Sequence, residues 1–72
     1  MQIKAETDLM DIEETCRFFG GNKPLNPATL YRGVKSGRYP RPVKVGPNTN
    51  RWVRPECQSS LEQWLAERDR DI

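Results

Sequence analysis

The sequence lacks histidine and has only two cysteines, so it has few of the side chains that metal sites and nucleophilic enzymes use. Cys16 and Cys57 cannot complete a four-ligand zinc site unless carboxylates join them at unusual spacing. We therefore interpret both as small buried apolar residues. A glycine-rich phosphate loop and a carboxylate pair in an apolar pocket are also missing. We expect neither an enzyme nor a bound cofactor or metal.

Long apolar runs are missing as well. No stretch approaches the roughly 20 apolar residues of a membrane span, and residues 1–14 are too acidic for a signal or transit peptide. We expect a cytoplasmic, nucleoid-associated protein without membrane contact. The 72 residues have room for one domain with a thin core, and we predict flexible ends at 1–8 and 70–72.

Acidic residues are absent from residues 17–54, although the net charge of the whole chain is only +2. That segment carries nine cations, whereas the segments before and after it have net charges of −4 and −3. A folded surface with so much charge of one sign repels itself unless it meets a polyanion, so nucleic acid is the expected partner. In the alternative interpretation, the acidic ends of the chain neutralise the basic surface in space.

Capping and turn signals predict two helices before the middle of the chain. Asp11 followed by Glu14 is a capping-box pattern, and with the "GG" stop it predicts a helix over residues 12–19. The "NP" before and the glycine after residues 27–36 predict a second helix there.

The second predicted helix has two faces. Leu30 and Val34 lie on an apolar face, and Gly33 beside them indicates close packing against another element. Tyr31 flanks this face, and its side chain could either pack against the core or donate its hydroxyl to a phosphate. The opposite face is basic and bears hydroxyls, and its residues are Ala28, Thr29, Arg32, Lys35 and Ser36.

Prolines and alternating valines predict a β-hairpin, with strands at residues 42–45 and 51–53 joined by "GPNTN". The side chains expected to cover the core are Val43, Val45 and Trp52. The side chains expected to point away from it are Lys44 and Arg51. The residues of the small polar tip are Asn48, Thr49 and Asn50.

A last helix is predicted over residues 55–69, beginning at a proline. Its expected apolar stripe consists of Cys57, Leu61, Trp64 and Leu65. The order of helix, turn, helix, hairpin and helix is that of a small winged helix-turn-helix domain, an α+β fold that is mostly α.

In such a fold the second helix enters the major groove of DNA, and the hairpin reaches an adjacent backbone or minor groove. Arg32 can bind guanine bidentately, while Ala28 and Thr29 can contact a thymine methyl or a phosphate. Lys35 is expected to meet phosphate. The cations in and around the hairpin would straddle phosphates, and they are Arg38, Arg41, Lys44 and Arg51.

The chain also resembles the AlpA-type and excisionase-type winged-helix proteins of prophages and other integrative elements. The resemblance lies in "DIEETCRFFGG", "ATLYRGVKSGRYPRPVKVG", "RW" and "EQWLAERD", which together span most of the chain. The loop "GGNKPLN" is longer than the tight turn usual in that family. The resemblance implies recognition-helix contacts by Thr29, Tyr31, Arg32 and Lys35. It implies wing contacts by Lys44, Asn48, Asn50 and Arg51.

The function that the resemblance implies is that of an excisionase, or recombination directionality factor. Several copies would bind repeated sites on double-stranded DNA near an attachment site and bend the DNA. This bending would favour excision by a site-specific integrase, a tyrosine recombinase. The acidic ends and the basic middle of the chain also permit head-to-tail contacts between neighbouring copies on DNA. One alternative is an AlpA-like transcription regulator of integrase or excision genes. Another is a protein-interaction module that binds an acidic partner. RNA binding is less expected, because Phe18, Phe19, Trp52 and Trp64 are assigned to the core.

Overall fold

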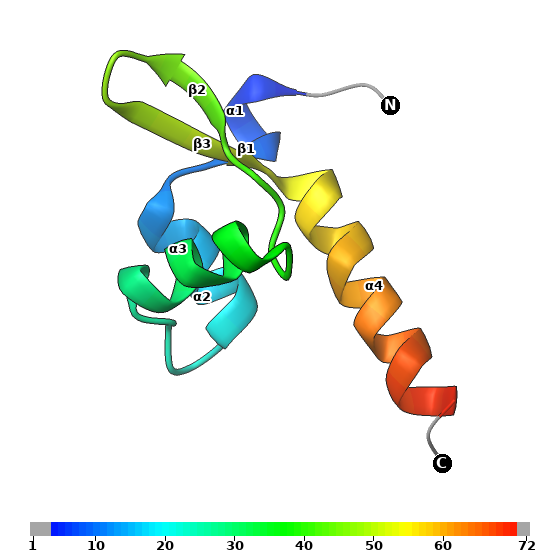
Figure 1. Cartoon of the computed structure of the whole chain (residues 1–72). Helices are drawn as coiled ribbons and strands as arrows, with labels where there is room; N and C mark the ends of the chain where they lie inside the picture. The colour runs from blue at the N-terminus through cyan, green and yellow to red at the C-terminus, as the bar shows by residue number, and fades with distance from the viewer. Residues whose placement is uncertain (1–3, 71–72) are drawn as a thin grey trace.

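The computed structural model describes residues 4–70, and its architecture is α+β with most residues in helices (Figure 1). The helices are α1 Ala5–Asp8, α2 Ile12–Gly20, α3 Pro27–Ser36 and α4 Arg54–Arg70. The strands are β1 Leu9–Met10, β2 Val43–Gly46 and β3 Thr49–Val53. The three longer helices and the hairpin are confirmed, with shifts of one or two residues at some ends. The helical turn α1 and the strand β1 were not predicted.

Helices α2 and α3 begin at the cap residues that the local sequence predicts, and α3 ends at the predicted glycine. Asp11 Oδ1 accepts a hydrogen bond from the backbone N–H of Glu14 at 2.8 Å, and Asn26 Oδ1 accepts one from the N–H of Ala28 at 2.8 Å. Both bonds satisfy N–H groups that have no partner within the helix. Gly37 ends α3 in the left-handed region with φ of 87°, which favours glycine.

Strand β1 completes a three-stranded antiparallel sheet in the order β1-β3-β2. Leu9 lies opposite Val53, and Met10 lies opposite Trp52. Met10 and Trp52 are both fully buried, so this short pairing brings the start of the chain into the core. A strand of two residues has no detectable period of its own, which explains why sequence patterns missed it.

The predicted flexible ends fall partly outside the described residues, at 1–3 and 71–72. Within the described part, α1 forms one helical turn and Arg70 is the last residue of α4. Flexibility of residues 4–8 and of Arg70 stays a prediction.

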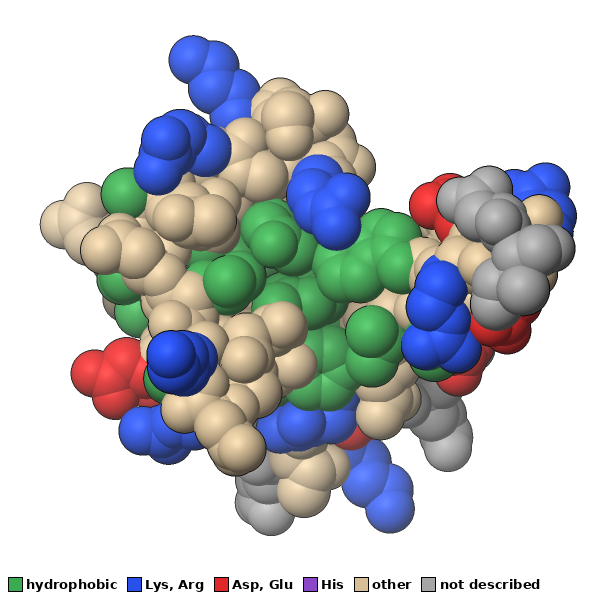
Figure 2. Space-filling view, turned by 90° about the horizontal axis from the view of Figure 1, so that it is seen from below, with side chains coloured by type: hydrophobic (Ala, Val, Ile, Leu, Met, Phe, Trp, Pro, Cys, Tyr) green, Lys and Arg blue, Asp and Glu red, His purple; other side chains and the backbone are tan. Residues whose placement is uncertain are grey.

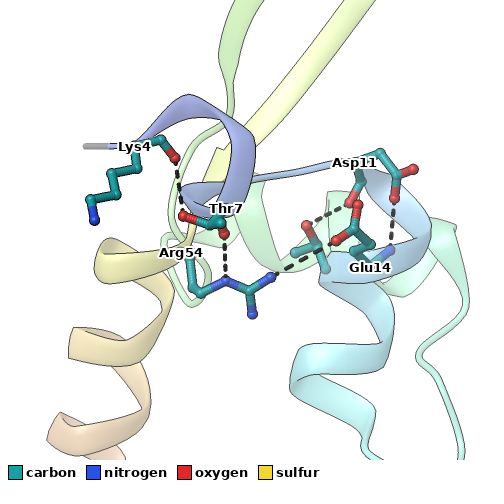
Figure 3. A network of polar contacts seen from close by, with 6 residues as sticks. Lys4, Thr7, Asp11, Glu14 and Arg54 are labelled. Atoms are coloured by element: carbon teal, nitrogen blue, oxygen red, sulfur yellow. Dashed lines mark hydrogen bonds and ion pairs between the residues drawn. The ribbon is translucent and has the colours of Figure 1, made fainter.

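Arg54 joins three elements at the start of α4 (Figure 3). Its Nε donates a hydrogen bond to the carbonyl oxygen of Thr7 at 3.0 Å, and its guanidinium lies 3.8 Å from the Glu14 carboxylate. The Thr7 hydroxyl in turn donates to the carbonyl of Lys4 at 3.5 Å. Arg54 therefore holds α1, α2 and α4 together, although partial exposure of the ion pair limits its contribution to stability.

The core is small and lies between α2, α3, α4 and the sheet. Its buried members are Met10, Cys16, Leu30, Trp52 and Cys57. The predicted burial of both cysteines is confirmed, and both are free thiols. Burial raises the pKa of each thiol, to about 11 for Cys57. Neither thiol is therefore a reactive nucleophile near neutral pH.

Gly33 packs closely against the loop that follows α3, as its position inside a helix predicts. The residue is buried, and the Tyr39 ring occupies the space that a Cβ at position 33 would need. This ring also packs against Phe19 and Trp64, with centroid distances of 4.7 and 5.7 Å. Tyr39 thus joins α2, α3 and α4.

The predicted faces of the hairpin are wrong in part. Val43 pairs with Arg51 and Lys44 with Asn50, so Val43 and Arg51 share one face and Lys44 lies on the other. The register shifts between Lys44 and Gly46, and this irregularity contains Val45. As a result Val43 and Val45 are 47% and 51% exposed. The prediction that Trp52 covers the core is confirmed.

The predicted apolar stripe of α4 packs against the core only in part. Cys57 is buried and Trp64 is half-buried, but Leu61 and Leu65 are 40% and 41% exposed. The C-terminal end of α4 extends away from the other elements (Figure 1), and the aromatic contacts of the helix are made by Trp64, with Phe19 and Tyr39. Within residues 4–70, no helix combines the length and apolar character that a membrane crossing requires.

Candidate nucleic-acid interface

The exposed face of α3 gathers the side chains assigned to a recognition helix. Leu30 and Gly33 are buried on the inner side of the helix, which turns the rest outward. The exposed residues include Ala28, Thr29, Tyr31, Arg32, Lys35 and Ser36. Two of these side chains bond back to the helix: Arg32 Nε donates to the carbonyl of Ala28 at 3.4 Å, and Ser36 Oγ donates to the carbonyl of Gly33 at 3.1 Å.

The hairpin residues differ in their exposure. Lys44 and Asn48 are exposed, whereas Thr49, Asn50 and Arg51 are half-buried. The Arg51 guanidinium donates a hydrogen bond to the carbonyl oxygen of Asn50 at 2.9 Å. Lys44 and Arg51 project from opposite faces of the hairpin, so a single flat surface cannot meet both cations.

Tyr31 links α3 to the hairpin. Its ring centroid lies 6.0 Å from that of Trp52, and the side chain is still 44% exposed. Tyr31 therefore packs, which was one of its two expected roles, while its exposed part stays available for another contact.

An open hollow of about 310 Å³ lies where Tyr31 meets the hairpin tip, and we call it the hairpin hollow. The predicted site residues that line it are Tyr31, Asn48, Thr49, Asn50 and Arg51. Asp11, the cap of α2, also lines it. No sequence pattern indicates this position of Asp11, because its role as a helix cap fully explains an aspartate there.

The loop between α3 and β2, residues 37–42, separates two further hollows. The α3 hollow lies on the side of α3, and Lys35, Ser36 and Arg41 are among its lining residues. The α4 hollow lies on the side of α4, and Arg38, Arg41, Glu56, Trp64 and Glu67 are among its lining residues. The predicted site residues Arg38 and Arg41 are therefore not equivalent. The carbon at the centre of the Arg38 guanidinium lies 4.7 Å from the centroid of the Trp64 ring.

Hydrophobic side chains gather in the middle of the face seen from below, with Lys and Arg side chains around them (Figure 2). Trp64 is only half-buried, as are Phe18 and Phe19, so the prediction that these rings belong to the core is confirmed fully only for Trp52. Phe19 lies 5.2 Å from Phe18 and 5.4 Å from Trp64, measured between ring centroids. These rings pack on one another, which leaves them less free to stack on bases.

Among the described side chains, the ion pairs lie outside α3 and the β2–β3 hairpin. Among the side chains that the structure describes, ion pairs form between Arg54 and Glu14 and between Arg68 and Asp69. Neither pair includes a residue of α3, β2 or the hairpin tip. Neutralisation of the basic surface by the acidic ends stays a hypothesis.

Within residues 4–70, no three acidic or cysteine side chains come together in a group that could hold a metal ion. The expectation that the protein is neither an enzyme nor a cofactor carrier stays a prediction.

The chain matches no protein-family model, and comparisons with curated proteins and with solved structures found no match either.

Proposed function

We propose that the protein binds double-stranded DNA with sequence preference, using α2 and α3 as a helix-turn-helix and the β2–β3 hairpin as a wing. The observation that supports this proposal is the joint placement of α3 and the hairpin tip. Arg32 and Lys35 of α3 and Asn48 of the hairpin tip are exposed. Tyr31 of α3 and the tip residues line one hollow, the hairpin hollow. The ion pairs of the described side chains lie elsewhere.

In this proposal α3 enters the major groove, which is wide enough to admit a helix. Arg32 reads a base edge, and guanine is the preferred base for a bidentate arginine. Ala28 and Thr29, in the first turn of α3, contact a thymine methyl or a phosphate. Asn48 and Lys44 contact the sugar–phosphate backbone from the wing.

The biological role that we propose is the promotion of excision of a mobile element. This step rests on the resemblance to excisionases. Several copies would bind repeated sites beside an attachment site, in head-to-tail contact with their neighbours, and bend the DNA for a tyrosine recombinase. Bending a site of 20 to 30 base pairs by 40 to 90° costs on the order of 1 to 6 kcal/mol, which several bound copies can supply together.

The test is binding of the purified protein to fluorescent duplexes that tile its own genomic neighbourhood, with unlabelled competitor present. Competitor-resistant binding to repeated sites near an attachment sequence supports the excisionase role. Binding only at a promoter favours the AlpA-like regulator instead. Absence of binding even at low salt would refute the DNA proposal and favour an acidic protein partner.

The salt dependence gives a second criterion. If about five cations neutralise phosphates, the logarithm of affinity falls with the logarithm of salt concentration with a slope of about −4 to −5. A slope near zero with tight binding would contradict phosphate contact.

A further inference from the structure

The loop of residues 37–42 is fixed to the rest of the domain at several points. The backbone N–H of Arg38 donates to the carbonyl oxygen of Gly33 at 2.8 Å, and the buried indole N–H of Trp52 donates to that of Pro40 at 3.0 Å. The Tyr39 ring between these residues fills the space above Gly33. The loop therefore has a defined position relative to both α3 and the hairpin. The backbone of its two arginines, Arg38 and Arg41, is held in place by these contacts.

The two arginines leave the loop toward different surroundings. Arg38 lies over the Trp64 ring of α4 and lines the α4 hollow, which also contains the carboxylates of Glu56 and Glu67. Arg41 lines that hollow too, but it also lines the α3 hollow together with Lys35.

The charges of the two hollows decide where an anion can bind. The α4 hollow has two carboxylates, Glu56 and Glu67, that offset the charge of its two arginines and repel a phosphate. The charged residues lining the α3 hollow are Lys35 and Arg41, both cationic and both exposed. The Ser36 hydroxyl in the same hollow already donates its hydrogen to Gly33, so the two cations are the groups that would hold an anion there.

We propose that the two arginines of this loop have separate roles in DNA binding. Arg41 and Lys35 together hold a backbone phosphate in the α3 hollow. Arg38 touches no DNA and is a positioning residue, which stacks on Trp64 and so fixes the loop that carries Arg41. This proposal rests on the proposed DNA-binding function. It divides the cations of the acid-free segment 17–54 into residues that contact DNA and residues that position them.

The stacking of Arg38 on Trp64 also gives α4 a role. A guanidinium within about 6 Å of a tryptophan centroid is attracted to the face of the ring, and the 4.7 Å distance meets this criterion. Trp64 itself packs against Tyr39 of the same loop, at 5.7 Å between centroids. Through Trp64, α4 is thus a support for the loop, even though the helix lies apart from the proposed recognition face.

The experiment compares the salt dependence of duplex binding for the wild type and for Lys35→Gln, Arg41→Gln and Arg38→Gln. Each phosphate contact contributes about 0.9 to the slope of log affinity against log salt. We expect Lys35→Gln and Arg41→Gln to make the slope shallower by up to that amount. A loss of 0.9 in slope means that the affinity falls by about 3.5-fold less between 50 and 200 mM salt. We expect Arg38→Gln to weaken binding by the same factor at every salt concentration and to leave the slope unchanged.

Two further variants separate a positioning role from a general loss of structure. Arg38→Lys keeps a cation that can stack on Trp64, so it should restore most of the affinity that Arg38→Gln loses. In a Trp64→Leu background, Arg38→Gln should have no further effect on affinity, because the stacking partner is already gone. Circular dichroism of each variant checks that it is folded before binding is measured.

Several results would overturn the proposal. A shallower slope for Arg38→Gln would make Arg38 a phosphate contact, and an unchanged slope for Arg41→Gln would remove Arg41 from the interface. In both cases the wild type still binds DNA, so only the division of roles fails. If the wild type shows no DNA binding at low salt, the proposed function itself fails, and this inference with it.

Discussion

Substitution of Gly33 by alanine should destabilise the domain, although the same change stabilises most helices. Inside an exposed helix, alanine is favoured over glycine by about 1 kcal/mol. Here the new Cβ would overlap atoms Cδ2 and Cε2 of the Tyr39 ring. That ring cannot move away freely, because it packs against Phe19 and Trp64 and because the N–H groups of Arg38 and Tyr39 both donate to the Gly33 carbonyl.

The magnitude follows from these opposing contributions. Overpacking of a filled site costs about 1 to 3 kcal/mol, and we expect the upper part of this range because the ring is held on several sides. After subtraction of the gain in helix propensity, Gly33→Ala should lower the free energy of unfolding by about 2 kcal/mol. For a domain of this size that corresponds to a decrease in Tm of about 8 to 16 °C.

The assay is urea unfolding followed by tryptophan fluorescence, with Ser59→Ala in α4 as the matched control. Ser59 is exposed, so its substitution should stabilise the domain by a few tenths of a kcal/mol, or about 0.5 at most. In a Tyr39→Ala background the space above Gly33 is empty, and Gly33→Ala should then become stabilising. Both background variants are measured in sucrose, which strengthens apolar burial and keeps the weaker proteins folded. If Gly33→Ala is at least as stable as the wild type, or still destabilises the domain without the Tyr39 ring, overlap with that ring is not what limits position 33.

Three other predictions concern stability. Asn26→Ala removes the cap of α3 and should cost about 1 kcal/mol in urea unfolding, whereas an unchanged midpoint would mean that the cap bond contributes nothing in solution. Leu30→Ala should cost about 2 to 5 kcal/mol because Leu30 is fully buried, while Leu65→Ala, at 41% exposure, should cost less than about 1 kcal/mol; similar costs would mean that Leu65 is covered. Burial raises the pKa of Cys57 from 9.0 to about 11, so the unfolded chain loses this proton first. The stabilisation from the neutral thiol is then complete below pH 9 and is lost as the pH rises toward about 11, and Cys57→Ala should remove this part of the decline when unfolding is measured from pH 8 to 11.

Local signals in the sequence predicted the parts of the fold that depend on neighbouring residues. The caps Asp11 and Asn26 and the left-handed Gly37 act within one or two turns of a helix, so residue type and spacing were sufficient. The close packing at Gly33 was also predictable, since a glycine inside a helix is costly unless space is short. The identity of the neighbour, Tyr39, was not predictable from spacing.

The errors have a common physical cause, which is the limited size of the body of the domain. Alternation along β2 assigned Val43 and Val45 to the core. Both are exposed, because the register shifts within β2 and because the hairpin projects beyond the other elements. The periodicity of α4 assigned Leu61 and Leu65 to the core, but both are exposed, because the helix is longer than the surface that the other elements offer to cover it. Periodicity shows which side chains share a face, but it does not show how far the partner surface extends.

The candidate site was predictable as a set of exposed residues, but its internal division was not. Wheel positions placed Arg32 and Lys35 on the outer face of α3, as the structure has them. The stacking of Arg38 on Trp64 joins residues far apart in the chain, and no local pattern reports such a contact. The same limit applies to Asp11 beside the hairpin tip.

The DNA-binding surface that we propose consists of α3 and the hairpin tip. The most direct test is titration of the isotope-labelled protein with a short duplex at low salt, followed by amide chemical shifts in NMR spectra. We expect the largest shifts at Thr29, Arg32, Lys35 and Asn48, with small shifts in the second half of α4. Absence of shifts at low salt, or shifts confined to α4, would rule out α3 and the hairpin tip as the DNA-binding surface.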